Sequence, residues 1–315
     1  MSNFNNPHEM FMKPKTEQFG THMVMTNVQQ TNKTKYISID SKYKDDYQDN
    51  NTANTHADLL SNQISTSNFN ITLPERISNV KSITMTHAEI PLTYYNISSN
   101  LGNNYFKVID ATSTETMITV EDGFYNETEL QNKINATLTG EGIDLTLTIN
   151  SISQTSIVSG SATFSIHFDV NSQGIHDKYR IKSKLGWLLG FRLLNYEVTT
   201  TPVSSEEFSN LNGSKYLYLA IDEFSKGNQN SFMSPLHSSL INKNILSRIA
   251  LDNNNYGYGS ILPANINNGY LISDTRSYNG NVDIQKLNIQ LLNEDGLPVI
   301  LNGLDFSFCL KVEYL

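Results

Sequence analysis

The amino-acid sequence predicts an all-β protein of the antiparallel sandwich or barrel type. Apolar residues recur at every second position in many short segments rich in Thr, Ile, Val and aromatic residues, which is the pattern of half-buried strands. Clusters of Gly and Asn separate these segments, and no alternation of strands with long helices indicates βαβ units. The chain of 315 residues can bury its core as one large β domain or as two ordinary domains.

The first segment, residues 1–34, contains five methionines and shows neither a period of two nor one of 3.6. We interpret it as an extended or disordered N-terminal arm. Two roles stay open for this arm: a plain chain terminus, or a segment that becomes ordered on a neighbouring subunit.

The main domain is expected at 35–315 and begins with a strand at 36–40, followed by a polar loop over 41–54. Alternation over 69–85 and the run 89–95 predict strands that a turn at Pro74 separates, since proline cannot donate to a strand ladder. Other short alternating segments predict strands at 105–109, 117–120, 145–149, 164–170, 216–221, 246–251, 287–292 and 306–314.

One segment carries a clear helix start. Asn126 is placed to be the N-cap, with Glu129 three residues later as its capping-box partner. Leu130, Ile134 and Leu138 then fall on one face before Gly140, which predicts a short amphipathic helix.

A second helix is predicted over 178–189, where apolar residues form a stripe beside the only tryptophan, Trp187. Gly190 follows it and suits a left-handed C-cap. Because an amphipathic helix must lay its apolar stripe on another element, we expect both helices to cover an open end of the sandwich.

The charge balance excludes several partners. With 31 acidic and 22 basic side chains, the formal net charge of −9 disfavours diffuse binding to nucleic acid or to anionic membranes. No segment approaches the ~18 consecutive apolar residues of a transmembrane helix, and the N-terminus lacks the apolar core of a secretory signal. We expect no direct nucleic-acid binding and no transmembrane segment.

Residues that could carry catalysis are sparse. The seven histidines are scattered singly, and His167 lies in a predicted strand beside Ser165 and opposite Ile166, so we interpret it as a surface or a structural histidine. Cys309, the only cysteine, lies in the last strand and is predicted to be a small buried hydrophobic residue. The acidic loop 40–49 lacks the spaced oxygens of an EF-hand and reads as solvated. We therefore expect no enzymatic activity, no cofactor and no metal.

The loop that contains Tyr256 and Tyr258 is the one candidate contact site. The two tyrosines alternate with glycines and could stack on a sugar or on a partner protein, although incidental tyrosines in a loop are the simpler interpretation.

Several short motifs follow one another in a fixed order, namely YISIDSKY at 36–43, FNITL at 69–73, VKSI at 80–83, AEIP at 88–91 with tyrosines at 94 and 95, GFYNETEL at 123–130, LGF at 189–191 and GLDFSFCL at 303–310. This order resembles the single jelly-roll penton and minor capsid proteins of giant DNA viruses and virophages. The resemblance implies a jelly-roll sandwich that forms homopentamers at the fivefold vertices of an icosahedral virus particle, beside a double jelly-roll major capsid protein and other minor capsid proteins. It places the protein in the virion, after synthesis in the host cell cytoplasm.

The predicted strands outnumber the eight of a minimal jelly roll, so an inserted subdomain is expected within 110–235. Three alternatives to the penton stay open: a minor or cement protein inside the shell, a jelly-roll attachment module that binds a glycan or receptor through Tyr256 and Tyr258, and a hydrolase built on a β-sandwich.

Overall fold

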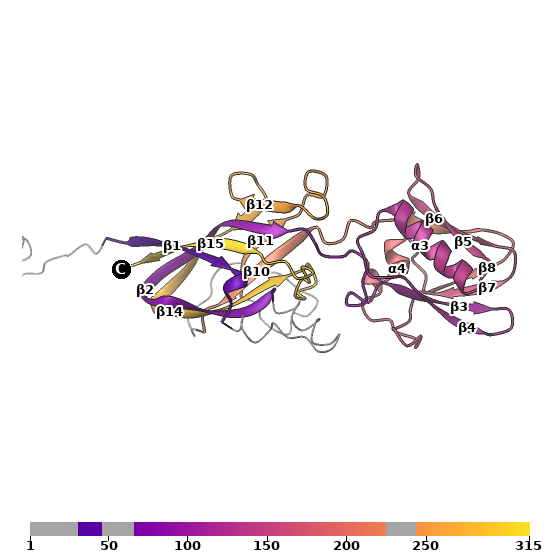
Figure 1. The fold of residues 1–315 in the computed structure, drawn as a ribbon, viewed down its shortest axis with the longest axis horizontal. Coiled ribbons are helices and arrows are strands. Elements are labelled where there is room, and N and C mark those ends of the chain that lie inside the picture. The colour runs from indigo at the N-terminus through magenta and orange to yellow at the C-terminus, as the bar shows by residue number, and fades with distance from the viewer. Residues whose placement is uncertain (1–30, 46–65, 225–243) are drawn as a thin grey trace, which may run out of the picture.

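The structure is a computed structural model that describes residues 31–45, 66–224 and 244–315. Figure 1 shows two lobes side by side, which we call the body and the second lobe. The second lobe comprises residues 97–211, and the body contains the remaining described residues. The arm predicted at 1–34 lies outside the described residues as far as residue 30, and the first strand begins at Lys33.

The body is a jelly-roll sandwich, which confirms the predicted fold class. One layer consists of β1 (Lys33–Asp40), β15 (Ser307–Tyr314), the second half of β2 (Asn68–Pro91) and β12 (Ile261–Asn265), all antiparallel. The other layer consists of the first half of β2, then β14 (Arg276–Leu292), β10 (Tyr216–Asp222), β11 (Ile245–Ala250) and β13 (Leu271–Ser273). A short 3-10 helix, η1 (Ser41–Tyr43), follows β1.

Strand β2 passes through both layers, which corrects the prediction of two strands separated by a turn at Pro74. Its register against β14 shifts three times, and Pro74 lies in the shift between Thr72 and Ile77. A bulge lets an exposed proline stay inside a strand, because the missing N–H falls where the ladder is already interrupted. The strand ends at Pro91 and does not continue through the predicted run to residue 95.

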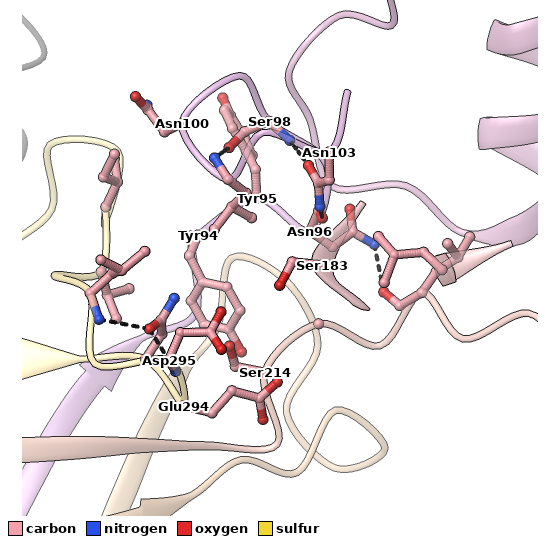
Figure 2. A pocket seen from close by; sticks show the side chains of 18 of the residues that line it. Tyr94, Tyr95, Asn96, Ser98, Asn100, Asn103, Ser183, Ser214, Glu294 and Asp295 are labelled. Carbon is pink, nitrogen blue, oxygen red and sulfur yellow. Dashed lines mark hydrogen bonds between the residues drawn. The ribbon is translucent and has the colours of Figure 1, made fainter. Parts of the chain in front are cut away.

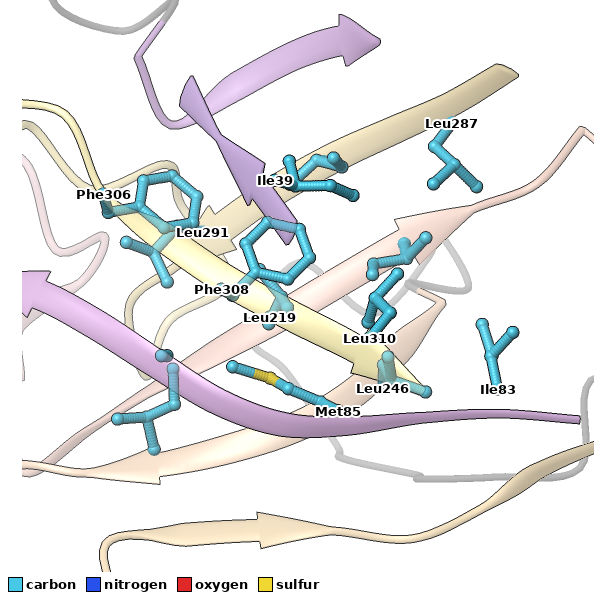
Figure 3. Packing of buried hydrophobic residues seen from close by; sticks show 14 of the residues in the cluster. Ile39, Ile83, Met85, Leu219, Leu246, Leu287, Leu291, Phe306, Phe308 and Leu310 are labelled. Atoms are coloured by element: carbon cyan, nitrogen blue, oxygen red, sulfur yellow. The ribbon is translucent and has the colours of Figure 1, made fainter. Parts of the chain in front are cut away.

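The body core lies between the two layers, as Figure 3 shows. Ile39, Phe308 and Leu310 come from the β1–β15 side, and they meet Leu219, Leu246 and Leu291 from the opposite layer. All of these side chains are at most 1% exposed. Burying a side chain of this size contributes roughly 1.5–3 kcal/mol of hydrophobic stabilisation, so the contact between the layers stabilises the body.

The second lobe is inserted between β2 and β10. It contains a sheet of β4 (Glu115–Thr119), β3 (Tyr105–Asp110), β7 (Phe164–His167) and β8 (Asn195–Val198), and a sheet of β5 (Leu145–Ile149), β6 (Thr155–Gly160) and β9 (Val203–Phe208). Helix α3 (Glu127–Gly140) packs on β5, and the short η2 (Ile181–Ser183) and α4 (Leu185–Leu188) complete it. These elements enclose a separate apolar core.

Helix α3 confirms the first helix prediction. The side chain of Asn126 accepts a hydrogen bond from the N–H of Glu129, and the Glu129 carboxylate accepts one from the N–H of Asn126. Leu130, Ile134 and Leu138 are all buried in the second-lobe core.

The second helix prediction is wrong in length. Residues 178–180 are not helical, Arg180 adopts a left-handed conformation with φ of 54°, and only η2 and α4 form a helical turn each. Gly190 does adopt the predicted left-handed conformation, with φ of 93°. Both helices belong to the second lobe, so neither covers an end of the body sandwich: the inserted sheets supply the apolar surface that each helix needs.

Candidate interaction site in the cleft between the lobes

A cleft of about 1040 Å³ separates the two lobes. Its second-lobe wall comes from the loop 96–103, from the segment 180–192 and from the end of β9. Its body wall comes from residues 213–217 and from the β14–β15 loop at 293–302. Figure 2 shows Tyr94 and Tyr95, from the segment that connects the lobes, projecting into this space.

The neck between the lobes is fixed by one buried asparagine. The Asn96 side chain is in the outgoing connection, and its Nδ2 donates to the carbonyl of Leu211 in the returning connection and to that of Tyr125, both at 2.7 Å. Its Oδ1 accepts from the N–H of Tyr125 at 2.8 Å. A single side chain therefore ties both connections to the loop that precedes α3.

Among the described residues, an ion pair and a ring contact also join the two lobes. Arg180 of the second lobe donates to the Asp295 carboxylate of the body at 2.9 Å, with both side chains about one-third exposed. Phe124 of the second lobe stacks on Tyr258 of the body, with ring centroids 4.8 Å apart.

The cleft is nearly neutral. Four cationic residues and three carboxylates line it, and Arg180 and Asp295 neutralise each other. Its field therefore selects neither strongly anionic nor strongly cationic ligands, in contrast to the acidic chain as a whole.

Trp187 is the largest side chain of the cleft. The guanidinium carbon of Arg192 lies 4.1 Å from its ring centroid and the ammonium of Lys182 lies 5.8 Å away. Arg192 is held there because its Nη1 donates to the carbonyls of Trp187 and Phe191. The indole is thus part of a cation–π cluster and is fixed in one orientation.

Burial raises the pKa of Tyr94 to about 12. Its hydroxyl therefore stays protonated at neutral pH and remains a hydrogen-bond donor at the body side of the cleft (Figure 2). The pKa of Tyr258 is also raised, mainly by desolvation.

The structure separates the two tyrosines of the predicted contact loop. Tyr256 packs edge-on against Tyr270, with centroids 5.8 Å apart, and contacts the body core. Tyr258 stacks on Phe124 and lies 6.4 Å from Tyr95. Each ring thus contacts aromatic side chains of this chain, and the two do not form one shared face.

Other residues singled out from the sequence lie away from the cleft. His167 lies beside Ser165, with its Nε2 3.0 Å from the Ser165 hydroxyl, as the alternation predicted. The carboxylate of Asp45 accepts two hydrogen bonds from Thr72, and the rest of the acidic loop, 46–49, lies outside the described residues.

Cys309 is half-buried, which corrects the prediction of a buried residue. Phe308 and Leu310 point into the core, so strict alternation turns the cysteine side chain to the outer face of β15.

Among the residues that the structure describes, no group of three His, Cys, Asp or Glu side chains is placed to hold a metal ion. In the same residues, no helix has the length and hydropathy needed to cross a membrane.

The sequence did not predict the cleft. Its residues come from segments far apart in the chain, and the available signals were indirect: a lone tryptophan at 187 and the turn sequence Asn293-Glu294-Asp295-Gly296. Neither signal shows that the two segments face each other.

No protein-family model matches the sequence, and no curated protein matches it. Among solved structures, the chain is similar to the crystal structure of the selenomethionine-labelled mavirus penton protein, with 10% sequence identity and a TM-score of 0.39. The alignment covers 79% of this chain and 98% of that chain.

Proposed function

We propose that the protein is a structural capsid subunit, specifically the penton, and that it forms a homopentamer at the fivefold vertices of an icosahedral virus particle. In this role it contacts the double jelly-roll major capsid protein and other minor capsid proteins in the virion. The role is structural and needs no catalytic group.

The observation that carries this proposal is the exposure of large apolar side chains at opposite edges of one layer of the body. That layer runs β1–β15–β2–β12, so β1 and β12 are its two outer strands among the residues that the structure describes. Tyr36 on β1 is 64% exposed and Ile261 on β12 is 60% exposed. Soluble monomeric proteins usually carry features that prevent such strand edges from pairing with another chain, and exposed apolar patches mark interaction sites.

Two different strand edges with exposed apolar side chains on one subunit favour assembly into a ring. When the β1 edge of one copy packs on the β12 edge of the next, the contact is heterologous, and repeating it generates a closed ring if the rotation fits. Tyrosine is enriched and charge is depleted in the centres of protein interfaces, which agrees with the 16 tyrosines and 17% charged residues of this chain.

The proposal is tested by the mass of the purified full chain in solution. Mass photometry and analytical ultracentrifugation are expected to show a species of five 35.4 kDa chains, and cryo-electron microscopy of the source particle is expected to place the chain on the fivefold axis. A monomer at every concentration, also with the major capsid protein present, would contradict a capsid-building role. A ring of another size would contradict the penton assignment.

Matched variants locate the contact. Tyr36→Ser and Ile261→Ser are expected to dissociate the ring without unfolding the chain, because both side chains are mostly solvent-exposed in the monomer. Ile152→Ser serves as the control, since Ile152 is 94% exposed on a second-lobe turn and away from both edges. Equal effects of all three variants would show that the edges are not the contact.

A further inference from the structure

We propose that the cleft between the lobes is a docking site for an extended peptide, and that the peptide is residues 1–30 of a neighbouring copy of this chain. The inference rests on the proposed function, because it requires copies of the chain to lie next to one another. It assigns a site and a partner to a segment whose sequence shows no core periodicity.

Both walls of the cleft carry apolar side chains among their polar and charged ones. Trp187, Leu188 and Phe208 lie on the second-lobe side, and Leu297, Pro298 and Ile300 lie on the body side. Phe208 is 60% exposed although it is the last residue of β9, so its ring is available to an incoming side chain.

Free hydrogen-bonding groups accompany this apolar surface. Within the described residues, the side chains of Asn100, Ser183 and Ser214 make no hydrogen bond to another residue, and Figure 2 shows all three at the cleft. Extended peptides need partners for their N–H and C=O groups, and amide and hydroxyl side chains supply both donors and acceptors. Tyr94 adds a hydroxyl that stays protonated at neutral pH.

The size and chemistry of the cleft favour a peptide over a sugar. Its volume of about 1040 Å³ is at the upper end of the ~300–1,000 Å³ that holds small ligands. Sugars stack on free aromatic faces, but Arg192 lies 4.1 Å from the ring centroid of Trp187 and occupies one face of this largest ring of the cleft.

Residues 1–30 match this lining. They include five methionines and three phenylalanines, and their two lysines and two glutamates cancel. Methionine adapts to irregular apolar surfaces, and a segment with no net charge suits a cleft that is nearly neutral.

The position of β1 favours a neighbouring copy as the donor. Lys33 pairs with Tyr314 at the end of the body that is far from the second lobe, and β1 then runs about 26 Å toward that lobe (Figure 1). The first described residues, 31 and 32, therefore lie at the end of the body that is away from its own cleft.

The test uses the full chain with the photo-cross-linking residue p-benzoylphenylalanine at position 208. Irradiation of an equal mixture of ¹⁴N- and ¹⁵N-labelled protein is expected to join position 208 to peptides from residues 1–30, with mixed-isotope pairs showing that the donor is another copy. The same residue at position 272 is the control, because Ile272 is half-exposed on β13 and does not line the cleft. Absence of cross-links to residues 1–30, or pairs from a single isotope only, would overturn the proposal.

Trp187, the only tryptophan, supplies an independent measurement on full-length protein. Replacing Phe4, Phe11 and Phe19 by Ser is expected to raise the acrylamide quenching constant of Trp187 about twofold, because an ordered peptide covers most of the surface of its site. An unchanged constant at concentrations where the wild-type protein is assembled would contradict docking.

The two proposals fail separately. Pentamers without cross-links would overturn only the docking site, whereas a monomer would overturn the penton assignment. A monomer whose cross-links come from single chains would show that the cleft binds the chain's own N-terminal segment, which contradicts the neighbouring copy as the donor.

Discussion

The body and the second lobe obtain their cores in different ways. In the body, strands from opposite ends of the sequence pair with each other, as in Ile37 with Leu310 and Phe69 with Ile289. In the second lobe, β3 pairs with β4 and β5 with β6 as neighbouring hairpins, and α3 packs on the strand that follows it. Non-local pairing has a larger loop-closure cost, so the second lobe is expected to form first and the body to depend on both chain ends.

The two cores also differ in their buried charges. The body encloses the ion pair of Arg276 and Glu223, with both side chains fully buried, and Tyr278 donates a further hydrogen bond to Glu223. In the second lobe, the buried Lys184 donates to carbonyl oxygens and to the partly exposed carboxylate of Asp177. The contrast teaches that, among the described residues, the body contains an ion pair with both partners fully buried, whereas each ion pair of the second lobe has at least one partly exposed partner.

The largest effect on stability is expected from breaking the buried ion pair of the body. Arg276 Nη1 lies 2.6 Å from Glu223 Oε1 and also donates to the carbonyl of Ile221, so Arg276→Ala leaves a carboxylate buried without its cation. The expected loss is about 3–5 kcal/mol of unfolding free energy, measured by urea denaturation followed by circular dichroism.

A matched variant tests whether the loss of stability comes from the burial of the ion pair or from the loss of an arginine charge alone. Arg76 pairs with Asp283 on the surface, where its side chain is 60% exposed, and Arg76→Ala is expected to cost at most about 1 kcal/mol. Similar losses for both variants would show that the body does not depend on its buried pair.

A second effect is confined to the second lobe. Gly190 has a φ of 93°, and a Cβ there would lie 2.1 Å from the carbonyl oxygen of Glu207, so Gly190→Ala combines backbone strain with a backbone clash. The expected loss is about 3 kcal/mol, followed through Trp187 emission. Gly257→Ala is the control, because its Cβ would meet nothing within 4 Å, and a loss as large as that of Gly190→Ala would refute the geometric explanation.

A smaller effect is expected at the start of α3. Asn126→Ala removes one half of the capping box and is expected to cost about 1 kcal/mol, while Asn126→Asp keeps an acceptor and costs far less. The midpoints of thermal unfolding, read from Trp187 emission, compare the two variants. Equal midpoints would show that packing on β5 alone determines the helix.

The smallest effect depends on pH. The hydrogen bond from Lys184 lowers the pKa of Asp177 below its ordinary value, with a further contribution from the N–H of Tyr179. A carboxyl with a lower pKa in the folded state stabilises the fold above its unfolded pKa of about 3.9, and this contribution is lost as pH falls through the folded pKa. Asp177→Asn is therefore expected to be less stable than wild type at pH 7 and equal to it at pH 2. A constant difference at both pH values would contradict this linkage.

The local sequence pattern predicted those helices and strands whose formation depends little on their tertiary partners. The strand at 145–149 and the capped helix after Asn126 were predicted with the bounds that the structure shows, because alternation and capping are local properties. The strands β6, β8, β9, β12 and β13 were missed, since they are short or contain few apolar residues and gain their stability from pairing with neighbouring strands.

The sequence by itself determined the all-β class and the apolar faces of most strands, since a period of two directs every second side chain to one face. Only the tertiary structure decided that β2 crosses both layers of the body, that Cys309 faces outward, and that Trp187 and Pro298 line opposite walls of one cleft. Periodicity assigns a side chain to a face, but the choice of partner for that face depends on contacts between residues far apart in the chain.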